Sequence, residues 1–296
     1  MTKLVVSMPG SGLLADRLAA GLCAEHAEPR TRRFPDGESY VRLDTDCENK
    51  DLIVVGSLDR PDEKFLQLIF LCDLLRELGA ARVVLCAPYL AYMRQDKRFR
   101  AGEAVTSQSF ARILCRAVDG LVTVDPHLHR YRNLGDLYNV PTRVGHAAGL
   151  IADWIKTEVR RPLLVGPDSE SEQWVADVAA RAGVPHIVLE KTRRGDRDVE
   201  VSVPEVERWR DHRPVLVDDI ISTAGTMIET VRHLGAAGLS APMCVGVHGV
   251  FADDAHGELL GAGVQGIVTT NTIAHETNGI DVSGILIEAL DDLFGE

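Results

Sequence analysis

An apolar run that ends in two adjacent carboxylates is the part of this sequence best suited to chemistry. Residues 215–217 are apolar, Asp218 and Asp219 follow, and a run of small residues begins three positions later. That run consists of Ser222, Thr223, Ala224, Gly225 and Thr226. In such a loop, successive backbone N–H groups can turn toward a phosphate, and a helix that begins near Gly225 adds its positive end. The paired carboxylates suit acceptance of hydrogen bonds from vicinal ribose hydroxyls, with Mg²⁺ nearby, so the stretch predicts a sugar-phosphate site.

The alternative is an ordinary strand-turn-helix junction of a parallel sheet, because such loops often carry Asp, Ser and Thr as helix caps. Paired aspartates followed by a Ser-Thr-small-Gly-Thr run are more specific than a lone glycine-rich turn. The phosphate site is therefore the favoured interpretation.

Two segments in the first half carry polar groups suited to a nucleotide. Residues 34–40 combine an aromatic side chain, a Pro-Asp-Gly turn and two carboxylates, although Pro-Asp-Gly more often marks a plain turn. Residues 94–100 contain four cations just after the expected strand 82–87. A cationic loop after a strand is where an α/β protein binds phosphate, and a solvated charged loop is the alternative.

Two further segments could ligate a divalent ion. Asp125 and His127 follow the expected strand 121–124, and imidazole with carboxylate can bind such an ion. A hydrogen-bonded histidine without a metal is an equally good interpretation of His127. Asp168 ends the first strand of the second half, a position favoured for Mg²⁺ binding.

These segments must be positioned by the elements that surround them, and the pattern of those elements is regular. Expected strands are the β-branched apolar runs 4–7, 52–56, 82–87, 121–124, 163–166, 186–190, 214–217, 243–247 and 266–270. Expected helices, from apolar residues at helical spacing, are 13–26, 64–79, 106–118, 146–159, 171–182 and 225–238. Strands that alternate with helices predict an α/β fold with parallel sheets covered by helices on both faces.

A new strand-helix series begins after residues 136–142, which predicts domains 1–145 and 146–296. Both halves repeat strand and helix at similar spacing, which hints at a duplicated fold. Residues 191–205 differ, because they combine several cations with few large apolar side chains. We expect them to form an exposed, mobile loop or hairpin.

Composition limits the partners and the compartment. A net charge of −12 disfavours nucleic acid as a partner, because a polyanion needs clustered cations. The six cysteines form no Cys-x-x-Cys pair and predict a reduced, cytoplasmic protein. No signal peptide and no window of eighteen apolar residues is found, so no membrane partner is expected.

Taken in order, these segments resemble the ribose-phosphate diphosphokinases, or phosphoribosyl-pyrophosphate (PRPP) synthetases, over nearly the whole chain. The resemblance rests on residues 34–40, 92–100, 125–127, 167–168, 191–194, 218–226, 248–251 and 269–273. Residues 218–226 are similar to the PRPP loop that this family shares with phosphoribosyltransferases. The compact segment 94–103 and the sequence of this loop look most like the archaeal-type branch.

The resemblance implies two tandem phosphoribosyltransferase-like domains, each a mostly parallel sheet flanked by helices, with ATP on the N-terminal side. It implies transfer of the diphosphoryl group of ATP to the 1-hydroxyl of ribose 5-phosphate, which gives PRPP and AMP. Mg²⁺ would be the metal, and ATP and ribose 5-phosphate the small-molecule substrates. A homo-oligomer, either a dimer or a hexamer, is also implied.

The resemblance also assigns roles to individual residues. The ATP site would contain Phe34, Asp36, Gly37, Glu38, Arg94 and Gln95. His127 and Asp168 would serve Mg²⁺, while Lys191 and Arg193 would act on the transferring group. The ribose 5-phosphate site would contain Arg193, Asp218, Asp219, Ser222, Thr223, Ala224, Gly225 and Thr226.

Three positions depart from the family pattern. Ala224 stands where glycine is usual, so its methyl group must fit without a positive φ or without touching the phosphate. An acidic run at residues 169–172 follows Asp168, and Thr192 stands where arginine is common. Two alternatives therefore stay open: a catalytically silent, regulatory homologue of the synthetase, and a phosphoribosyltransferase that consumes PRPP.

Overall fold

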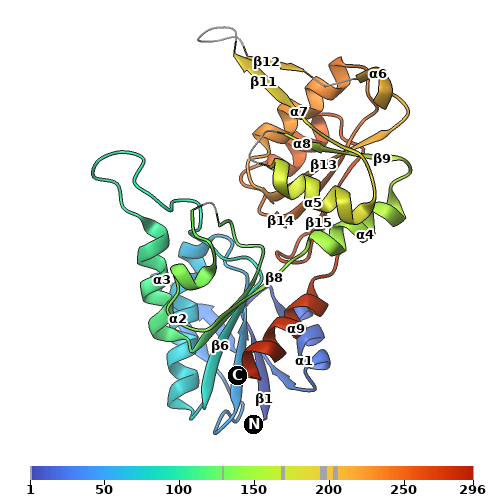
Figure 1. Ribbon diagram of the computed structural model, residues 1–296. Helices are drawn as coiled ribbons and strands as arrows, with labels where there is room; N and C mark the ends of the chain where they lie inside the picture. The colour runs from blue at the N-terminus through green and yellow to red at the C-terminus, as the bar shows by residue number, and fades with distance from the viewer. Residues whose placement is uncertain (1, 129, 168–170, 194–198, 203–205, 296) are drawn as a thin grey trace. The chain divides into compact units, whose positions relative to one another are not determined.

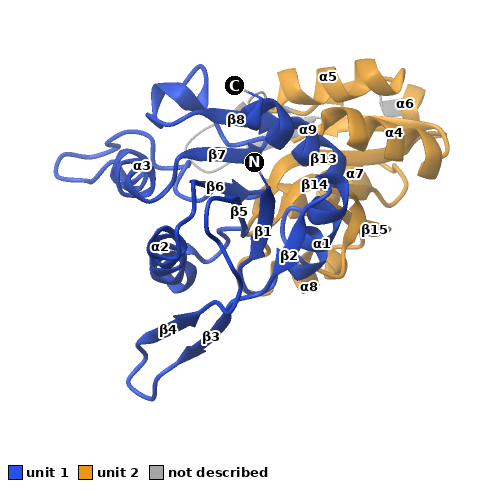
Figure 2. Ribbon diagram, turned by 90° about the horizontal axis from the view of Figure 1, so that it is seen from below, with its two compact units in different colours: residues 1–146, 272–274, 283–296 blue, residues 147–271, 275–282 orange. Residues whose placement is uncertain are grey.

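The computed structural model describes residues 2–128, 130–167, 171–193, 199–202 and 206–295, and from 190 to 206 it describes the backbone alone. The chain divides into two compact units, which Figure 2 shows in different colours. Unit 1 comprises Met1–His146, Thr272–Ala274 and Ser283–Glu296. Unit 2 comprises Ala147–Asn271 and His275–Val282.

Unit 1 is built on a six-stranded sheet in which all neighbouring strands are parallel (Figure 1). In sheet order the strands are β2 (Glu25–Ala27), β1 (Lys3–Ser7), β5 (Asp51–Val55), β6 (Arg82–Ala87), β7 (Gly120–Val124) and β8 (Thr142–Gly145). The helices that contact one another in pairs are α1 (Gly12–Gly21) with α9 (Ser283–Phe294), and α2 (Pro61–Glu77) with α3 (Thr106–Ala117). A separate antiparallel hairpin joins β3 (Arg30–Arg33) to β4 (Ser39–Arg42), and a short 3₁₀ turn, η1, spans Leu134–Asp136.

Unit 2 is built on a second six-stranded parallel sheet. In sheet order its strands are β10 (His186–Val188), β9 (Pro162–Gly166), β13 (Arg213–Ile221), β14 (Met243–Gly249), β15 (Gly266–Thr270) and β16 (Asn278–Ile280). Its helices are α4 (Ala148–Glu158), α5 (Glu172–Ala182), α6 (Val206–Trp209), α7 (Gly225–Ala236) and α8 (Ala255–Gly261). The strands β11 (Glu190–Arg193) and β12 (Val199–Ser202) form an antiparallel pair.

The two sheets repeat one topology. In each unit the first strand lies between the second and the third, and the later strands follow in chain order on the third strand's side. In unit 2 the strand order therefore reverses between β9 and β13. Ligands of open α/β sheets bind outside the carboxyl ends of the strands at such a switch point.

The central strands explain why the apolar runs of the sequence are continuous. All four residues from Leu52 to Val55 in β5 are fully buried, because helices cover both faces of a parallel sheet. The residue types at the helix ends also explain where two of the helices begin or end. The helix α2 begins at Pro61, whose fixed φ suits the first turn, and α5 ends at Gly183 in the left-handed region.

The predicted α/β fold with two parallel-sheet domains is confirmed, and all nine predicted strand runs lie within or overlap observed strands. One element prediction was wrong in detail. The helix expected over 13–26 ends at Gly21, and residues 25–27 form β2 instead. Residues 191–205 do contain a hairpin, β11–β12, as one of the two forms expected.

The last helix belongs by its contacts to unit 1, although the sequence-based division at residue 145 assigns it to the second half. Leu286 and Leu290 of α9 are fully buried. Asp291 forms an ion pair with Lys3 of β1 at 2.6 Å, and Asp292 forms one with Arg143 of β8. Among the described residues, no helix combines the length and the apolar character needed to cross a membrane.

Candidate functional site

The predicted sugar-phosphate loop lies between β13 and α7, at the carboxyl edge of the second sheet. Residues 215–217 are buried in the centre of the sheet, whereas Asp218 and Asp219 are half-buried at its edge. The backbone N–H of Asp219 donates to Asp218 Oδ1 at 3.0 Å. Thr223 and Thr226 are exposed, so the polar groups of this loop are open to a ligand.

The start of α7 supplies backbone donors to that loop. The first helical hydrogen bond joins Ile228 N–H to Ala224 O at 2.8 Å, so the N–H groups of residues 225–227 have no intrahelical acceptor. The N-cap is an alanine, which has no side-chain oxygen to satisfy them. A dianionic phosphate is well matched to these donors, because the helix dipole also places positive potential there.

Ala224 adopts the left-handed conformation, with φ 56° and ψ 7°. The sequence left two ways for its methyl group to fit, and the structure rules out the one without a positive φ. Its side chain is only 7% exposed and packs in the core of unit 2 with Met227 and Phe251 among others. The methyl group therefore points into the protein, which leaves the backbone N–H groups of the loop uncovered.

The loop is braced by the segment that follows β14. The N–H of Phe251 donates to Ile221 O at 3.0 Å, and the N–H of Ala252 donates to Ser222 O at 3.1 Å. The strand β14 also packs closely under the end of β13, because a Cβ added to Gly246 would lie 2.7 Å from Ile221 Cδ1. This explains how residues 248–251 can matter to a site that they need not contact.

Three predicted site residues of the second half, Asp168, Lys191 and Arg193, have no described side chain. Asp168 lies outside the described residues, as do Ser169 and Glu170 of the acidic run. Lys191 and Arg193 lie on β11, opposite Val201 and Val199 of β12, and their side chains are not described. Their roles remain predictions from the resemblance.

In unit 1 the predicted adenine-binding residues occupy the β3–β4 hairpin. The turn closes through Phe34 N–H to Glu38 O at 2.8 Å, and Gly37 has a φ of 94°, which favours glycine. The Asp36 carboxylate accepts from Glu38 N–H at 3.2 Å. Phe34 is 37% exposed and stacks under the guanidinium of Arg32, with 4.3 Å between the guanidinium carbon and the ring centre. The β3–β4 hairpin belongs to unit 1 (Figure 2), and Phe34, Asp36 and Glu38 are exposed on it.

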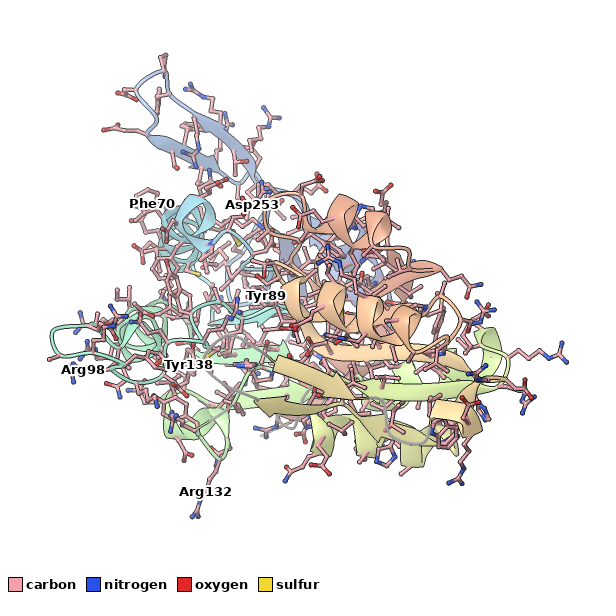
Figure 3. The ribbon with its side chains drawn as sticks, turned by 90° about the horizontal axis from the view of Figure 1, so that it is seen from above. Phe70, Tyr89, Arg98, Arg132, Tyr138 and Asp253 are labelled. Atoms are coloured by element: carbon pink, nitrogen blue, oxygen red, sulfur yellow. The ribbon has the colours of Figure 1, made fainter. Side chains whose placement is uncertain are left out.

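The cationic loop follows β6. Arg94 is exposed, and Gln95 is half-buried, with Oε1 accepting from Thr106 Oγ1 at 3.0 Å. The loop closes on Glu103, whose carboxylate accepts from the N–H groups of residues 99 and 100. Arg98 lies at the outer end of this loop (Figure 3). Arg94 and Gln95 lie at the start of this loop, soon after the end of β6.

His127 is half-buried in the loop after β7. The strands β6 and β7 are parallel neighbours, so the loop with Arg94 and the loop with His127 leave the same edge of the sheet. Asp125 has a φ of 31° and its carboxylate lies 2.9 Å from Nδ1 of His146. Asp125 is thus engaged within unit 1, and its pairing was not anticipated from the sequence.

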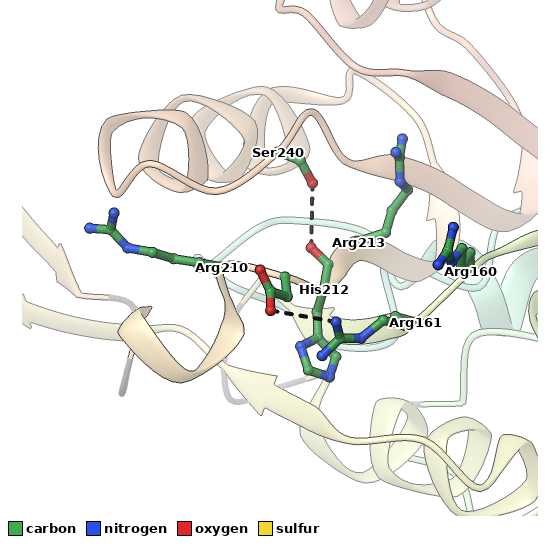
Figure 4. A pocket seen from close by; sticks show the side chains of 7 residues that line it. Arg160, Arg161, Arg210, His212, Arg213 and Ser240 are labelled. Carbon is green, nitrogen blue, oxygen red and sulfur yellow. Dashed lines mark hydrogen bonds and ion pairs between the residues drawn. The ribbon is translucent and has the colours of Figure 1, made fainter.

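A pocket of about 430 Å³ lies elsewhere in unit 2 (Figure 4). It is lined by Arg160, Arg161, Arg210, Asp211, His212, Arg213 and Ser240. These residues precede β9, β13 and β14 or, as Arg213 does, begin β13, so the pocket lies at the amino edge of the sheet. It is therefore separate from the loop at the carboxyl end of β13.

A cluster near the carboxyl edge of the second sheet was missed entirely. His256 of α8 lies beside His275 and Glu276, which connect β15 to β16. No local sequence pattern predicts it, because the two histidines are separated by a strand and share no spacing motif. His256 and His275 come close because β14 and β15, the strands that precede them, are neighbours in the sheet.

Comparisons with known proteins agree along the chain. Residues 3–117 match the N-terminal domain of ribose phosphate pyrophosphokinase, and residues 133–281 match the phosphoribosyl transferase domain. The chain is 34% identical to the ribose-phosphate pyrophosphokinase of Methanosarcina acetivorans, over 98% of this chain and 99% of the relative. It is also 34% identical to that of Methanopyrus kandleri, over 95% and 96%.

Among solved structures, the crystal structure of phosphoribosylpyrophosphate synthetase from Mycobacterium smegmatis matches with a TM-score of 0.85 and 25% identity. The match covers 100% of this chain and 99% of that one. Both halves, the order of the motifs and the strand topology thus agree with one family. The chain belongs to the ribose-phosphate pyrophosphokinase family.

Proposed function

We propose that this protein transfers the diphosphoryl group of ATP to the 1-hydroxyl of ribose 5-phosphate and releases PRPP and AMP. The observation that carries the proposal is the loop between β13 and α7, where open backbone donors follow two carboxylates at the topological switch point of the sheet. Relatives that share nearly the whole length of the chain are named for the same reaction.

Ribose 5-phosphate would bind with its phosphate at the start of α7. The N–H groups of residues 225–227 would donate to the phosphate oxygens, together with the hydroxyls of Thr223 and Thr226. Asp218 and Asp219 would accept hydrogen bonds from the 2- and 3-hydroxyls. This arrangement fixes the sugar at both ends and leaves its 1-hydroxyl directed away from the loop.

The transfer itself needs positioning and charge stabilisation more than covalent chemistry by the protein. The 1-hydroxyl attacks the β-phosphorus, its proton is lost, and the bond to the AMP oxygen breaks. Lys191 and Arg193 are proposed to stabilise the charge that develops on that oxygen. Both residues lie on the β11–β12 pair, and we propose that this pair covers the reacting groups and excludes water.

The metal fits the donor chemistry of the described site. Asp218 and Asp219 are half-buried carboxylates, and hard oxygen donors of this kind suit Mg²⁺. His127 and Asp168 are proposed as further ligands, either directly or through water. Bound Mg²⁺ would neutralise charge on the phosphate oxygens of ATP.

The nucleotide would use the hairpin and the cationic loop of unit 1. Phe34 offers an exposed ring for adenine, and Asp36, Gly37 and Glu38 offer polar groups beside it. Arg94 and Gln95 would contact the phosphates and the nucleoside. Because the hairpin presents these groups outward, we propose that it completes the site of a second copy of the chain, in a homo-oligomer.

The direct test is a reaction with purified protein, Mg²⁺, ATP and ribose 5-phosphate. AMP should form only when all three small molecules are present, and the sugar product should support a phosphoribosyltransferase that requires PRPP. Absence of AMP under conditions in which the protein is folded and binds ribose 5-phosphate would favour the silent, regulatory homologue instead.

A further inference from the structure

Three side chains with metal-binding atoms meet in unit 2, outside the site described above. They are His256, His275 and Glu276, and each offers one ligand atom within 4.8 Å of the others. His256 Nδ1 lies 3.5 Å from Glu276 Oε1. The two imidazole rings are nearly perpendicular, with 5.0 Å between their centres.

These distances can be compared with those around a bound ion. Zinc binds imidazole and carboxylate at about 2.0–2.2 Å in tetrahedral geometry, so neighbouring ligand atoms are about 3.4 Å apart. The distance between His256 and Glu276 already has this length. The wider separations within the cluster must shorten by up to about 1.4 Å on binding, which rotation of the exposed Glu276 side chain and of His256 allows.

The ring of His275 is fixed by contacts at Nδ1. Its Nδ1 lies 3.0 Å from Thr277 Oγ1, and that hydroxyl lies 2.8 Å from Thr269 Oγ1. Ligating histidines commonly use the second ring nitrogen in such a hydrogen bond, which fixes the ring and the tautomer. With the proton on Nδ1 donated to Thr277, the Nε2 lone pair is left for the ion. The longer contact from Thr277 N–H to Nδ1, at 3.3 Å, would be given up.

The surroundings also favour a neutral ring. His275 packs against Phe251, with 4.5 Å between ring centres, and its backbone N–H donates to Asn278 Oδ1 at 3.0 Å. Burial, and then the neighbouring His256, lower the pKa of His275 from its ordinary value, while Glu276 acts in the opposite direction.

We propose that His256, Nε2 of His275 and Glu276 form a binding site for one zinc-type divalent transition-metal ion. Two nitrogen donors and one oxygen donor suit Zn²⁺ or Co²⁺ better than Mg²⁺ or Ca²⁺. The ion would join α8 to the segment between β15 and β16, next to Phe251, whose N–H supports the end of β13. The site is independent of the proposed reaction.

Co²⁺ is the probe that tests the proposal, because its visible absorption reports nitrogen coordination. The protein, without an affinity tag and treated with a chelator, is titrated with Co²⁺ in excess Mg²⁺, which occupies the oxygen-rich sites. A Cys23→Ser background removes the exposed thiol as a competing ligand. We expect saturation at one Co²⁺ per chain, the intense bands of a tetrahedral site, and loss of the bands when one equivalent of Zn²⁺ is added.

Variants then locate the ion. Glu276→Gln and His256→Asn should each weaken Co²⁺ binding at least tenfold, about the effect of losing one ligand or its support. The matched control is His233→Asn, which removes another histidine-carboxylate pair of this unit, His233 with Glu229 at 3.6 Å, and should leave binding unchanged. Thermal unfolding without metal checks that each variant is folded.

Two results would overturn the proposal. One is the absence of saturable one-to-one binding in the folded parent protein. The other is a Co²⁺ affinity that is the same in the parent, Glu276→Gln and His256→Asn. Because no readout depends on turnover, failure here is distinct from failure of the proposed reaction.

Discussion

At the scale of single residues, Ala224 shows how a departure from the family pattern is accommodated. An L-residue in the left-handed region costs roughly 1–2 kcal/mol, and glycine avoids this cost. Here the alanine methyl group is buried in the core of unit 2, which stabilises the folded protein by roughly 0.8 kcal/mol. Alanine also restricts the unfolded chain more than glycine does, by roughly 0.5–1 kcal/mol.

These terms nearly cancel, so Ala224→Gly should change the free energy of unfolding by less than about 1 kcal/mol and preserve binding of ribose 5-phosphate. Ala224→Val should instead cost at least about 2 kcal/mol, because a β-branched residue at positive φ is strained and the site is already packed. Denaturant unfolding and substrate titration measure both effects. Equal stability of the valine variant would show that the backbone of the loop differs from that described.

Lys191 is the residue on which the mechanism depends most. If its ammonium acts mainly in the transition state, Lys191→Ala should lower kcat by about 10²–10⁴-fold, as for loss of one preorganised donor. Tm should stay nearly constant, since the residue lies on a two-stranded extension rather than in either six-stranded sheet. Arg193→Ala should behave similarly, and the double variant should lose less than the sum if both residues act on one charge. A kcat equal to that of the parent protein would remove Lys191 from the mechanism.

At the scale of elements, the sequence predicted the strands and helices that are determined by their own residues. The strand β13 and the helix α7 follow from an apolar run, paired carboxylates and a small-residue loop, all local features. The β3 strand, with the sequence Arg-Thr-Arg-Arg, was missed because an exposed hairpin has no apolar alternation to detect. The cluster of His256 and His275 was missed for another reason, since segments that meet through sheet order are not adjacent in sequence.

The place of α9 illustrates the same limit. Its assignment to unit 1 depends on contacts with strands more than 100 residues away, including Lys3 and Arg143. Leu290→Ala should therefore destabilise unit 1 by about 2–5 kcal/mol, because this leucine is fully buried. Leu66→Ala is the control, since Leu66 of α2 is 59% exposed. A Leu290 variant as stable as the Leu66 variant would mean that α9 is not docked on this unit in solution.

At the scale of the whole molecule, the cysteines give a measurable pH dependence. Burial raises the pKa of Cys72, Cys86 and Cys244 to about 12 from the ordinary 9.0. Above pH 9 the unfolded chain loses these protons while the folded chain keeps them, so stability is present below pH 9 and falls as the pH rises toward 12. Cys23 is exposed, so it is the control position.

Denaturant unfolding at pH 8.5 and pH 10 tests this. Between these values the parent protein should lose about 1 kcal/mol more stability than Cys86→Ala, because one titrating thiol has been removed. Cys23→Ala should lose as much as the parent. A Cys86→Ala variant with the same pH slope as the parent would indicate that this thiol titrates normally in the folded protein.

The two units also divide the work of the proposed reaction. They share one strand order, and each carries its polar loops at the carboxyl edge of its sheet. The loop after β13 suits a sugar phosphate, while the hairpin and the cationic loop of unit 1 suit a nucleotide. We therefore propose that one repeated strand order carries two different binding surfaces, each formed by loops or a hairpin.

The central claim is that two phosphoryl groups move together from ATP to the sugar. The most direct measurement follows ATP labelled separately at its α-, β- and γ-phosphorus atoms in a reaction with ribose 5-phosphate and Mg²⁺. We predict that the β- and γ-labels appear together in the sugar product in equal amounts and that the α-label remains in AMP. A β-label that stays in the nucleotide, as ADP beside a ribose bisphosphate, would contradict the account.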